Sequence, residues 1–232
     1  MFSNGPTIST NGLVLALDAG DRNSYVSGST TWIDLAGTNN GTLTNGPTFN
    51  TGSGGSIVFD GVNDSVVLLR PVQDDFSLSC WFKTNQVASG PGFPQWYGGM
   101  GLVDCEVVNI VDDFGTSMGA GKVLFGVGRN TPSSDLTITS SLTYNDNIWH
   151  NMVATRVRST GTITLYVDAQ QVATGTGGTQ SLTSATNMRI GAIQVNNNFF
   201  SGNIASTQIY NRALSASEVL QNYNATKGRF GL

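Results

Sequence analysis

Apolar and polar residues alternate strictly in the middle of the chain. In residues 162–168, Ile163, Leu165 and Val167 fall on one face, while threonine, tyrosine and aspartate fall on the other. Such alternation predicts a β-strand with one buried face. Residues 149–174 as a whole predict three antiparallel strands in succession. A meander with one apolar face must bury that face against a second layer, so the rest of the chain has to supply this layer.

Other stretches predict further short strands. FSLSCWFKT, residues 76–84, alternates in the same way, and its Cys80 is predicted to be a buried thiol, with a Cys80–Cys105 disulfide as the alternative. The five consecutive apolar residues 13–17 indicate a strand that is buried on both sides. The remaining predicted strands lie between turn signals: 56–59, 65–69, 102–110, 113–124, 123–127, 136–139, 188–193 and 199–210.

One stretch predicts an α-helix, from Ala216 to about Lys227. Ser215 and Glu218 have the spacing of a capping box, in which each side chain accepts a hydrogen bond from the backbone amide of the other residue. Gly228 stands where helices commonly end on a residue with positive φ. About twelve to fourteen strands and this single helix predict an all-β, two-sheet antiparallel jelly-roll sandwich.

The sequence shows no internal repeat or linker-like run. We therefore predict one domain, residues 13–232, preceded by an N-terminal arm, residues 1–12.

A net charge of −4 with only three lysines argues against binding to nucleic acid or to an anionic membrane. The longest apolar run near the N-terminus has five residues, too few for a signal peptide or a membrane span, so we expect neither export by that route nor membrane insertion.

Five segments occur in an order that resembles a known family. They are FSLSCWFKT (76–84), WHNMVATR (149–156), ITLYVDAQQV (163–172), MRIGAI (188–193) and GNIASTQIYNRALSASEV (202–219). Together they resemble the laminin-G-like, or concanavalin A-like, lectin/glucanase domains, and the resemblance covers nearly the whole chain from Leu13 on. The sequence departs from the family at Ala169, where glycine usually follows the aspartate, and at Cys105, where a small turn residue is expected.

The two ends of the chain resemble those of bacteriophage structural proteins and bacterial surface proteins. The resemblance implies a jelly-roll that binds or adheres, often to carbohydrate and sometimes with calcium. We expect a non-enzymatic virion protein, such as a capsid decoration, head-fibre or tail-associated protein. It would assemble in the host cytoplasm, contact other virion proteins and form a homo-oligomer. The alternative is a carbohydrate-binding lectin module on a phage or bacterial surface, with a host glycan as partner; a glycoside hydrolase is a third hypothesis.

The long loop 85–101, NQVASGPGFPQWYGGMG, combines glycines and prolines with three aromatic residues. Exposed aromatic side chains usually have a partner, which can be a sugar or a neighbouring subunit. The alternative is that these aromatic residues fold back over the sandwich. The asparagines at 196–198 could also contact a sugar, and for them the alternative is a plain turn. The candidates for ligand or subunit contact are Phe93, Trp96, Tyr97, Asn196, Asn197 and Asn198.

Calcium requires several oxygen ligands from carboxylates, amides and carbonyls. Two loops supply such groups, although aspartate also stabilises turns without a metal. The candidate calcium ligands are Asp60, Asn63, Asp64, Asp112 and Asp113.

Catalysis finds little support in the sequence. A glycosidase needs two nearby carboxyl groups. Asp104 and Glu106 would share a strand face, but the catalytic pattern of the β-glucanases in this superfamily, Glu-x-Asp-x-x-Glu, is absent from the sequence. The other glutamate, Glu218, is explained by the helix cap. His150 is the only histidine, and we expect it to have a structural role rather than to serve a catalytic triad or a metal. We therefore predict no catalytic residue.

Overall fold

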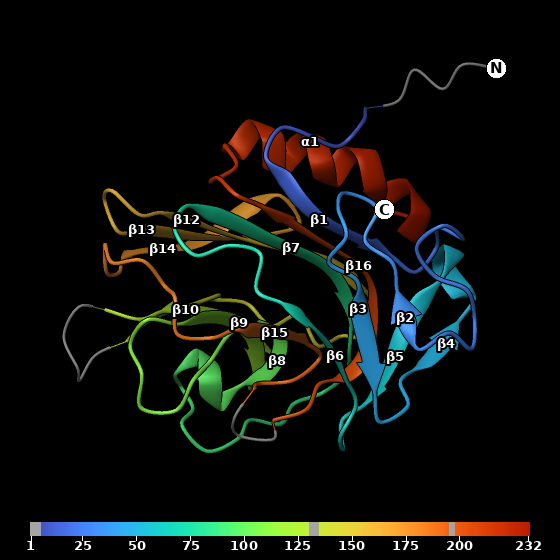
Figure 1. Cartoon of the computed structure of the whole chain (residues 1–232), viewed down its shortest axis with the longest axis horizontal. Helices are drawn as coiled ribbons and strands as arrows, with labels where there is room; N and C mark the ends of the chain where they lie inside the picture. Colours follow the sequence, from blue (N-terminus) through green and yellow to red (C-terminus); the bar gives the residue numbers. More distant parts are fainter. Residues whose placement is uncertain (1–5, 130–134, 195–197) are drawn as a thin grey trace.

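A computed structural model describes residues 6–129, 135–194 and 198–232. The chain forms two eight-stranded antiparallel sheets. Figure 1 shows the sheets stacked on each other, with one helix lying across the outer surface of the upper sheet. The alternation of apolar and polar residues predicted this two-layer arrangement, because each sheet has one face to bury.

Sheet A contains the predicted meander. Its strands are β1 (Leu13–Asp18), β4 (Thr48–Asn50), β5 (Ser56–Asp60), β7 (Phe76–Lys83), β12 (Trp149–Val157), β13 (Thr162–Val167), β14 (Gln170–Thr176) and β16 (Ser201–Tyr210). The order is β14-β13-β12-β7-β16-β5-β4, with β1 also paired to β16. Asp168 and Ala169 connect β13 to β14 with φ values of 52° and 62°, so the predicted tight turn is present.

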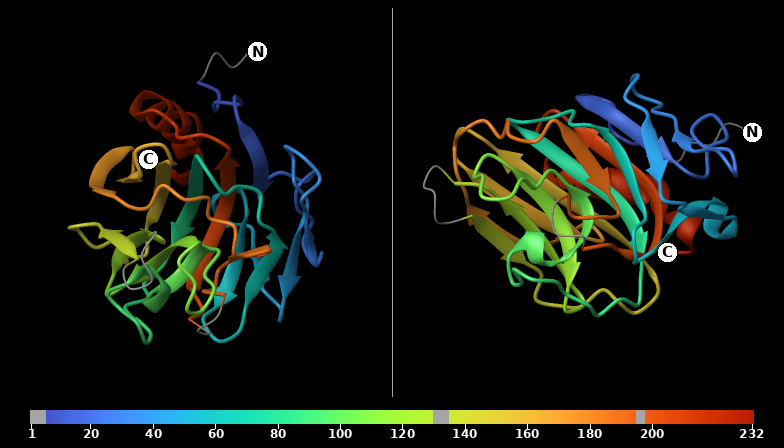
Figure 2. Two further views of the ribbon diagram at one scale, coloured as in Figure 1. Left: turned by 60° about the vertical axis from the view of Figure 1, so that its left-hand side comes forward. Right: turned by 60° about the horizontal axis from the view of Figure 1, so that its bottom comes forward.

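Sheet B forms the other layer. Its strands are β2 (Thr31–Trp32), β3 (Gly41–Thr44), β6 (Ser65–Leu69), β8 (Met100–Asp104), β9 (Phe114–Gly119), β10 (Lys122–Val127), β11 (Leu136–Thr139) and β15 (Asn187–Ile190). The order is β11-β10-β9-β8-β15-β6-β3-β2. The further views in Figure 2 show the curvature of both sheets, and β2 to β5 lie together on one side of the molecule in Figure 1.

The core fills the space between the sheets. From β7, Leu78 and Cys80 point into it, whereas Trp81 points to the outer face of sheet A. Cys105 also lies in the core, and both cysteines are free thiols. The predicted buried thiol is thus confirmed, and the alternative disulfide is absent.

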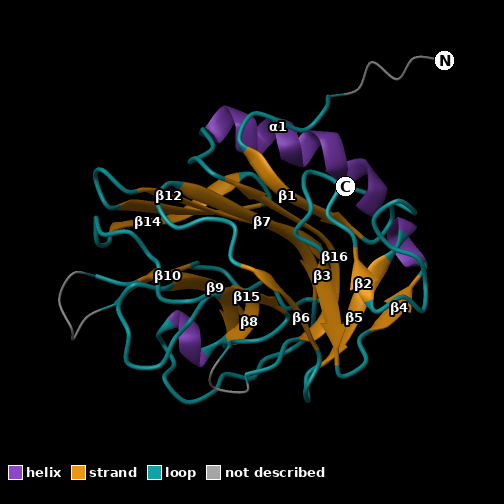
Figure 3. Ribbon diagram, in the orientation of Figure 1, coloured by secondary structure: helices purple, strands orange, loops and turns teal. Residues whose placement is uncertain are grey.

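Helix α1 (Ala216–Thr226) covers the outer face of sheet A (Figure 3). The predicted capping box is present: Ser215 Oγ accepts from the Glu218 amide at 3.3 Å, and a Glu218 carboxylate oxygen accepts from the Ser215 amide at 2.9 Å. The prediction for Gly228 was wrong. The chain continues as the 3₁₀-helix η3 (Lys227–Phe230), and Gly231 is the residue with positive φ, at 79°.

Three strand predictions need correction. In the run 13–17 only Leu15 and Leu17 are fully buried, while Leu13, Val14 and Ala16 are half-buried. The strand predicted for 102–110 ends at Asp104. Beyond this residue, backbone amides donate hydrogen bonds to aspartate carboxylates, as described below. The stretch predicted for 113–124 is two strands, since positive φ values at Ala120 and Gly121 turn the chain between β9 and β10. Within the described part of the chain, no helix is long and apolar enough to cross a bilayer.

Candidate functional site

The aromatic loop 85–99 folds back onto sheet B. Trp96 begins the 3₁₀-helix η2 (Trp96–Gly98) and is fully buried, packed with Leu124 and Ile193. Its ring lies where glycines leave space: a Cβ on Gly126 would come within 1.9 Å of Trp96 Cε3, and one on Gly115 within 2.8 Å of Trp96 Nε1. Trp96 is therefore part of a lid over the sheet and cannot stack on a sugar, which corrects its assignment as a contact residue.

The neighbouring candidates take part in the same lid. Phe93 is 38% exposed but packs close to Gly119. Asn198 is buried, and its side-chain amide donates to the carbonyl oxygen of Tyr97 at 2.9 Å. Asn198 therefore fastens the loop instead of offering its amide to a ligand, while Asn196 and Asn197 lie outside the described residues. The alternative interpretation, a loop that folds back over the sandwich, is confirmed for Trp96.

Four acidic residues gather at one end of sheet B, next to this lid. Asp104 ends β8, and Glu106 follows it by two residues. Asp113 directly precedes β9, and Asp135 directly precedes β11. Because adjacent strands here are antiparallel, with Asp104 opposite the residue after Phe114, these positions lie at the same edge. The sequence suggested Asp104 with Glu106 as a pair, but it did not connect them to Asp113 and Asp135.

Backbone amides hold these carboxylates in place. One Asp104 oxygen accepts from the amides of Glu106 and Gln194, at 3.0 and 2.8 Å, and one Asp113 oxygen accepts from Val107 at 2.9 Å. These contacts replace ladder hydrogen bonds and explain why β8 stops at Asp104. The remaining oxygen of each aspartate is buried without a hydrogen-bond partner, although the Trp96 indole lies near that of Asp104.

Burial and the neighbouring carboxylates raise the pKa values of this acidic cluster. Burial raises the pKa of Asp104 to about 7 and, aided by the neighbouring carboxylates, that of Glu106 to about 9 and that of Asp113 to about 8. Tyr97 borders the cluster, and its pKa is raised by burial and then by Asp135. Three of its members, Asp104, Glu106 and Asp113, are at most 6% exposed, whereas Asp135 is half-buried.

The candidate calcium ligands act as turn-stabilising groups. One Asp60 oxygen accepts from the amides of Val62 and Asn63, and Asp64 accepts from the Asp60 amide at 3.0 Å. Asp112 contributes its carbonyl oxygen to Ser184. Among the described residues, no group of three or more His, Cys, Asp or Glu side chains is placed to hold a metal ion.

His150 lies between two aspartates. Its Nδ1 is 2.7 Å from Asp168 and its Nε2 is 3.1 Å from Asp146. The two carboxylates outweigh burial and raise the pKa of His150. Because both ring nitrogens contact carboxylates, neither is available to activate a nucleophile, and the structural role predicted for His150 agrees with this geometry.

An open groove lies elsewhere, where the edges of the two sheets meet beside β4. We call it the Tyr25–Phe49 groove. It consists of two adjoining hollows, of about 540 and 510 Å³, that share Tyr25, Ser27 and Phe49. The rings of Tyr25 and Phe49 are 5.4 Å apart at 39° and form its apolar floor. Its rim contains glycines, a few apolar residues and six small polar residues: Ser27, Ser29, Thr30, Asn45, Thr48 and Thr51.

The loop that forms this groove is firmly held. Ser24 Oγ donates to the carbonyl of Ile33 and accepts from the Asp18 amide, which ties the loop to β1. Tyr25 is only 4% exposed, and its hydroxyl donates to the Ser29 carbonyl at 3.0 Å. Phe49 is half-buried and lines both hollows.

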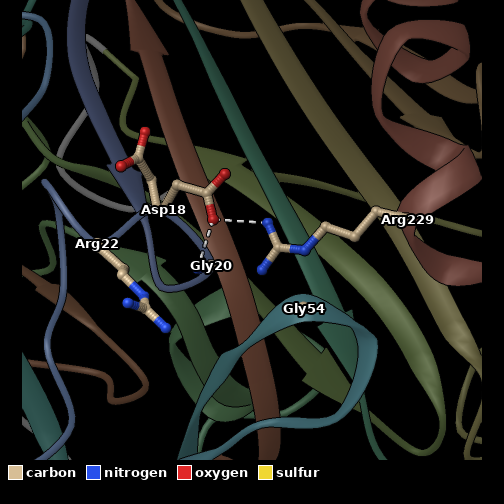
Figure 4. A pocket seen from close by; sticks show the side chains of 6 residues that line it. Asp18, Gly20, Arg22, Gly54 and Arg229 are labelled. Carbon is tan, nitrogen blue, oxygen red and sulfur yellow. Dashed lines mark hydrogen bonds and ion pairs between the residues drawn. The ribbon is translucent and has the colours of Figure 1, made fainter.

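A third hollow, of about 390 Å³, continues the groove and shares Gly20, Arg22 and Gly54 with it. In Figure 4 the Arg229 side chain reaches in from one side and pairs with Asp18, while Arg22 extends toward the hollow from the other. Arg229 Nε also donates to the Ser53 carbonyl at 2.8 Å. A Cβ on Gly20 would lie 2.5 Å from Arg229 Nη2, so only glycine lets the guanidinium reach this position.

Little in the sequence points to this site. Tyr25 and Phe49 lie 24 positions apart, and Arg229 lies about 180 residues further along the chain. The available signal was a run of Ser, Thr, Asn and Gly around these two aromatics, a composition that also suits ordinary turns.

The structure is an all-β, two-sheet antiparallel sandwich with a C-terminal helix, as the sequence predicts. The chain belongs to the concanavalin A-like lectin/glucanases superfamily, whose laminin-G-type family model matches residues 51–220. The family predicted from the five sequence segments is thus confirmed. No curated protein matches the sequence.

Similar solved structures are binding domains of clostridial toxins. The binding domain of Paraclostridial Mosquitocidal Protein 1 aligns with a TM-score of 0.71 and 18% identity, over 93% of this chain and 52% of that chain. The binding domain of botulinum neurotoxin DC, in complex with SialylT, aligns with a TM-score of 0.69 and 14% identity, over 94% and 52%. This chain thus spans about half the length of those domains, and at such identity the likeness concerns the fold.

Proposed function

We propose that the protein is a carbohydrate-binding adhesion domain that holds its glycan in the Tyr25–Phe49 groove. The observation that carries this proposal is the groove itself: the half-buried Phe49 lines both of its hollows, together with six serine, threonine and asparagine residues. Sugars combine apolar C–H faces with many hydroxyls, so an aromatic floor and a rim of small donors and acceptors suit them. With one stacking ring, we expect weak affinity for a single sugar unit, with a Kd on the order of 0.1–1 mM.

The comparisons support binding over assembly as the main role. One similar structure is the receptor-binding domain of botulinum neurotoxin type G, and another is the binding domain of botulinum neurotoxin DC in complex with SialylT. A third is described by the dependence of cell entry of botulinum neurotoxin type C on interaction with two ganglioside molecules. None of the matches reported above is a phage protein, so the virion role expected from the sequence becomes the second candidate. Its particle location, its homo-oligomeric state and its virion partners stay predictions.

A binding role without hydrolysis is also supported by the acidic cluster. The superfamily includes glucanases, and such enzymes need two carboxyl groups that a sugar chain can reach. Here Asp104, Glu106 and Asp113 are closed off from solvent, and no carboxylate lines the Tyr25–Phe49 groove itself.

The test is glycan binding by the intact chain and by a variant with a blocked groove. Ser27 is exposed and lines both hollows, so Ser27→Trp fills the groove without removing any core contact. The matched control is Ser159→Trp, in the exposed turn between β12 and β13. On a glycan array followed by calorimetry, the wild type and Ser159→Trp should bind the same glycans, and Ser27→Trp should lose them. Binding retained by a folded Ser27→Trp variant, or no binding by the wild type, would contradict the proposal.

A further inference from the structure

The third hollow adds a charged end to the Tyr25–Phe49 groove. Arg22 is an exposed residue that lines both this hollow and the adjoining half of the groove. It forms no hydrogen bond or ion pair with any other residue that the structure describes. A guanidinium that borders two connected hollows and has no protein partner is available to a ligand.

The other charges of the hollow are already engaged. Arg229 donates to Asp18 and to the carbonyl oxygens of Ser53 and Gly55, so it builds the wall and keeps the C-terminal segment in place. Its positive charge is balanced by Asp18, whose paired oxygen also accepts from the Gly20 amide.

Asp21 is the only other acidic residue that lines the hollow. One of its oxygens accepts from both the backbone amide and the side-chain amide of Asn23, at 2.8 and 3.0 Å, within its own turn. It forms no ion pair with Arg22. Arg22 is thus the one guanidinium of this hollow that is free to bind a ligand.

We infer that Arg22 binds an anionic substituent, a carboxylate or a sulfate, on a sugar held in the Tyr25–Phe49 groove. The inference rests on the proposed function and specifies its ligand class as acidic glycans. A guanidinium presents parallel N–H donors that match the two oxygens of a carboxylate or sulfate, and such charge-assisted pairs are stronger than neutral hydrogen bonds. The net charge of −4 gives no long-range attraction to anions, so the preference depends on this local contact.

The experiment uses pairs of glycans that differ only in one acidic group. The probes are lactose, sialyllactose and sulfated lactose, together with array pairs that differ by a uronic acid. Each is titrated into the full chain, Arg22→Gln, Arg22→Lys and the control Arg158→Gln, which removes an exposed arginine of the β12–β13 turn that pairs with Asp74. Circular dichroism confirms the fold of every variant.

Acidic members should bind the wild type about tenfold more tightly than their neutral partners. Arg22→Gln should abolish this difference and leave neutral binding unchanged, Arg22→Lys should keep part of it, and Arg158→Gln should keep all of it. The sialic acid, uronic acid and sulfate arms show which anion is preferred. If Arg22→Gln loses the same affinity for neutral and acidic glycans, or loses none, the role of Arg22 is overturned while the proposed function stays intact. If Ser27→Trp binds as well as the wild type, or no glycan binds at all, the proposed function fails and the inference fails with it.

Discussion

The two glutamates of the chain occupy opposite environments, and this gives a sharp prediction for Glu106→Gln. Burial and the neighbouring aspartates raise the pKa of Glu106 from 4.5 to about 9. In the unfolded chain the same group ionises near its ordinary value. As pH rises above about 4.5, the unfolded chain releases the proton while the folded protein retains it, so the wild type loses stability until the pH reaches about 9.

The magnitude follows from the size of the shift. Each pH unit between the two pKa values costs about 1.4 kcal/mol, so the penalty at pH 7 is on the order of 3 kcal/mol, part of which is shared with Asp113 and Asp104. Glutamine resembles the protonated carboxyl group in shape but has no proton to release. Glu106→Gln should therefore be more stable than the wild type by roughly 2 kcal/mol at pH 7, which raises Tm by about 4–8 °C for a chain of this size.

The assay is thermal unfolding followed by circular dichroism between pH 4.5 and 8.5. The gain in Tm should become small near pH 4.5, where Glu106 is protonated in the folded protein and about half protonated in the unfolded chain. Glu218→Gln is the matched control, because hydrogen bonds from Arg212 and the capping box lower the pKa of Glu218 to about 2. This variant should be less stable than the wild type at pH 7. A Glu106→Gln variant that is destabilised at every pH, or whose Tm falls with pH as steeply as that of the wild type, would refute the reasoning.

Three further substitutions test the packing. Gly126→Ala should cost about 2 kcal/mol in urea unfolding, because its Cβ would overlap the Trp96 ring; an unchanged midpoint would mean that the lid is loosely packed. Ala169→Gly should raise stability by about 0.5–1 kcal/mol, since Ala169 has a φ of 62°, and a lower Tm would show that the turn is not strained. Phe230→Ala should cost about 2 kcal/mol and alter tryptophan fluorescence, because its ring stacks 4.2 Å from that of Trp81; unaltered fluorescence would argue against this contact.

The sandwich was predictable because its determinants are local. Alternation in residues 162–168 specifies a strand with one buried face, and Asp168 with Ala169 specifies the turn that follows. Ser215 and Glu218 specify the start of the helix by direct mutual hydrogen bonds. In each case the residues that decide the structure lie within a few positions of one another, so that a periodic pattern records them.

The site was less predictable because its parts meet only in the folded chain. Trp96 has the appearance of an exposed ligand-binding aromatic until Gly115 and Gly126 are seen to provide space for its ring. The Tyr25–Phe49 groove depends on one ring from the loop between β1 and β2 and one from β4, 24 positions apart in the sequence, and its charged end is walled by an arginine near the C-terminus. No local periodicity encodes such long-range contacts.

The central claim is that a glycan occupies the Tyr25–Phe49 groove, and chemical-shift mapping tests it most directly. The amide signals of the isotopically labelled protein are followed while a glycan identified on the array is added. The account predicts that the largest shifts fall on Ser27, Phe49 and Thr51 and at Arg22. Shifts concentrated in the loop 85–99, with the groove signals unmoved, would contradict it.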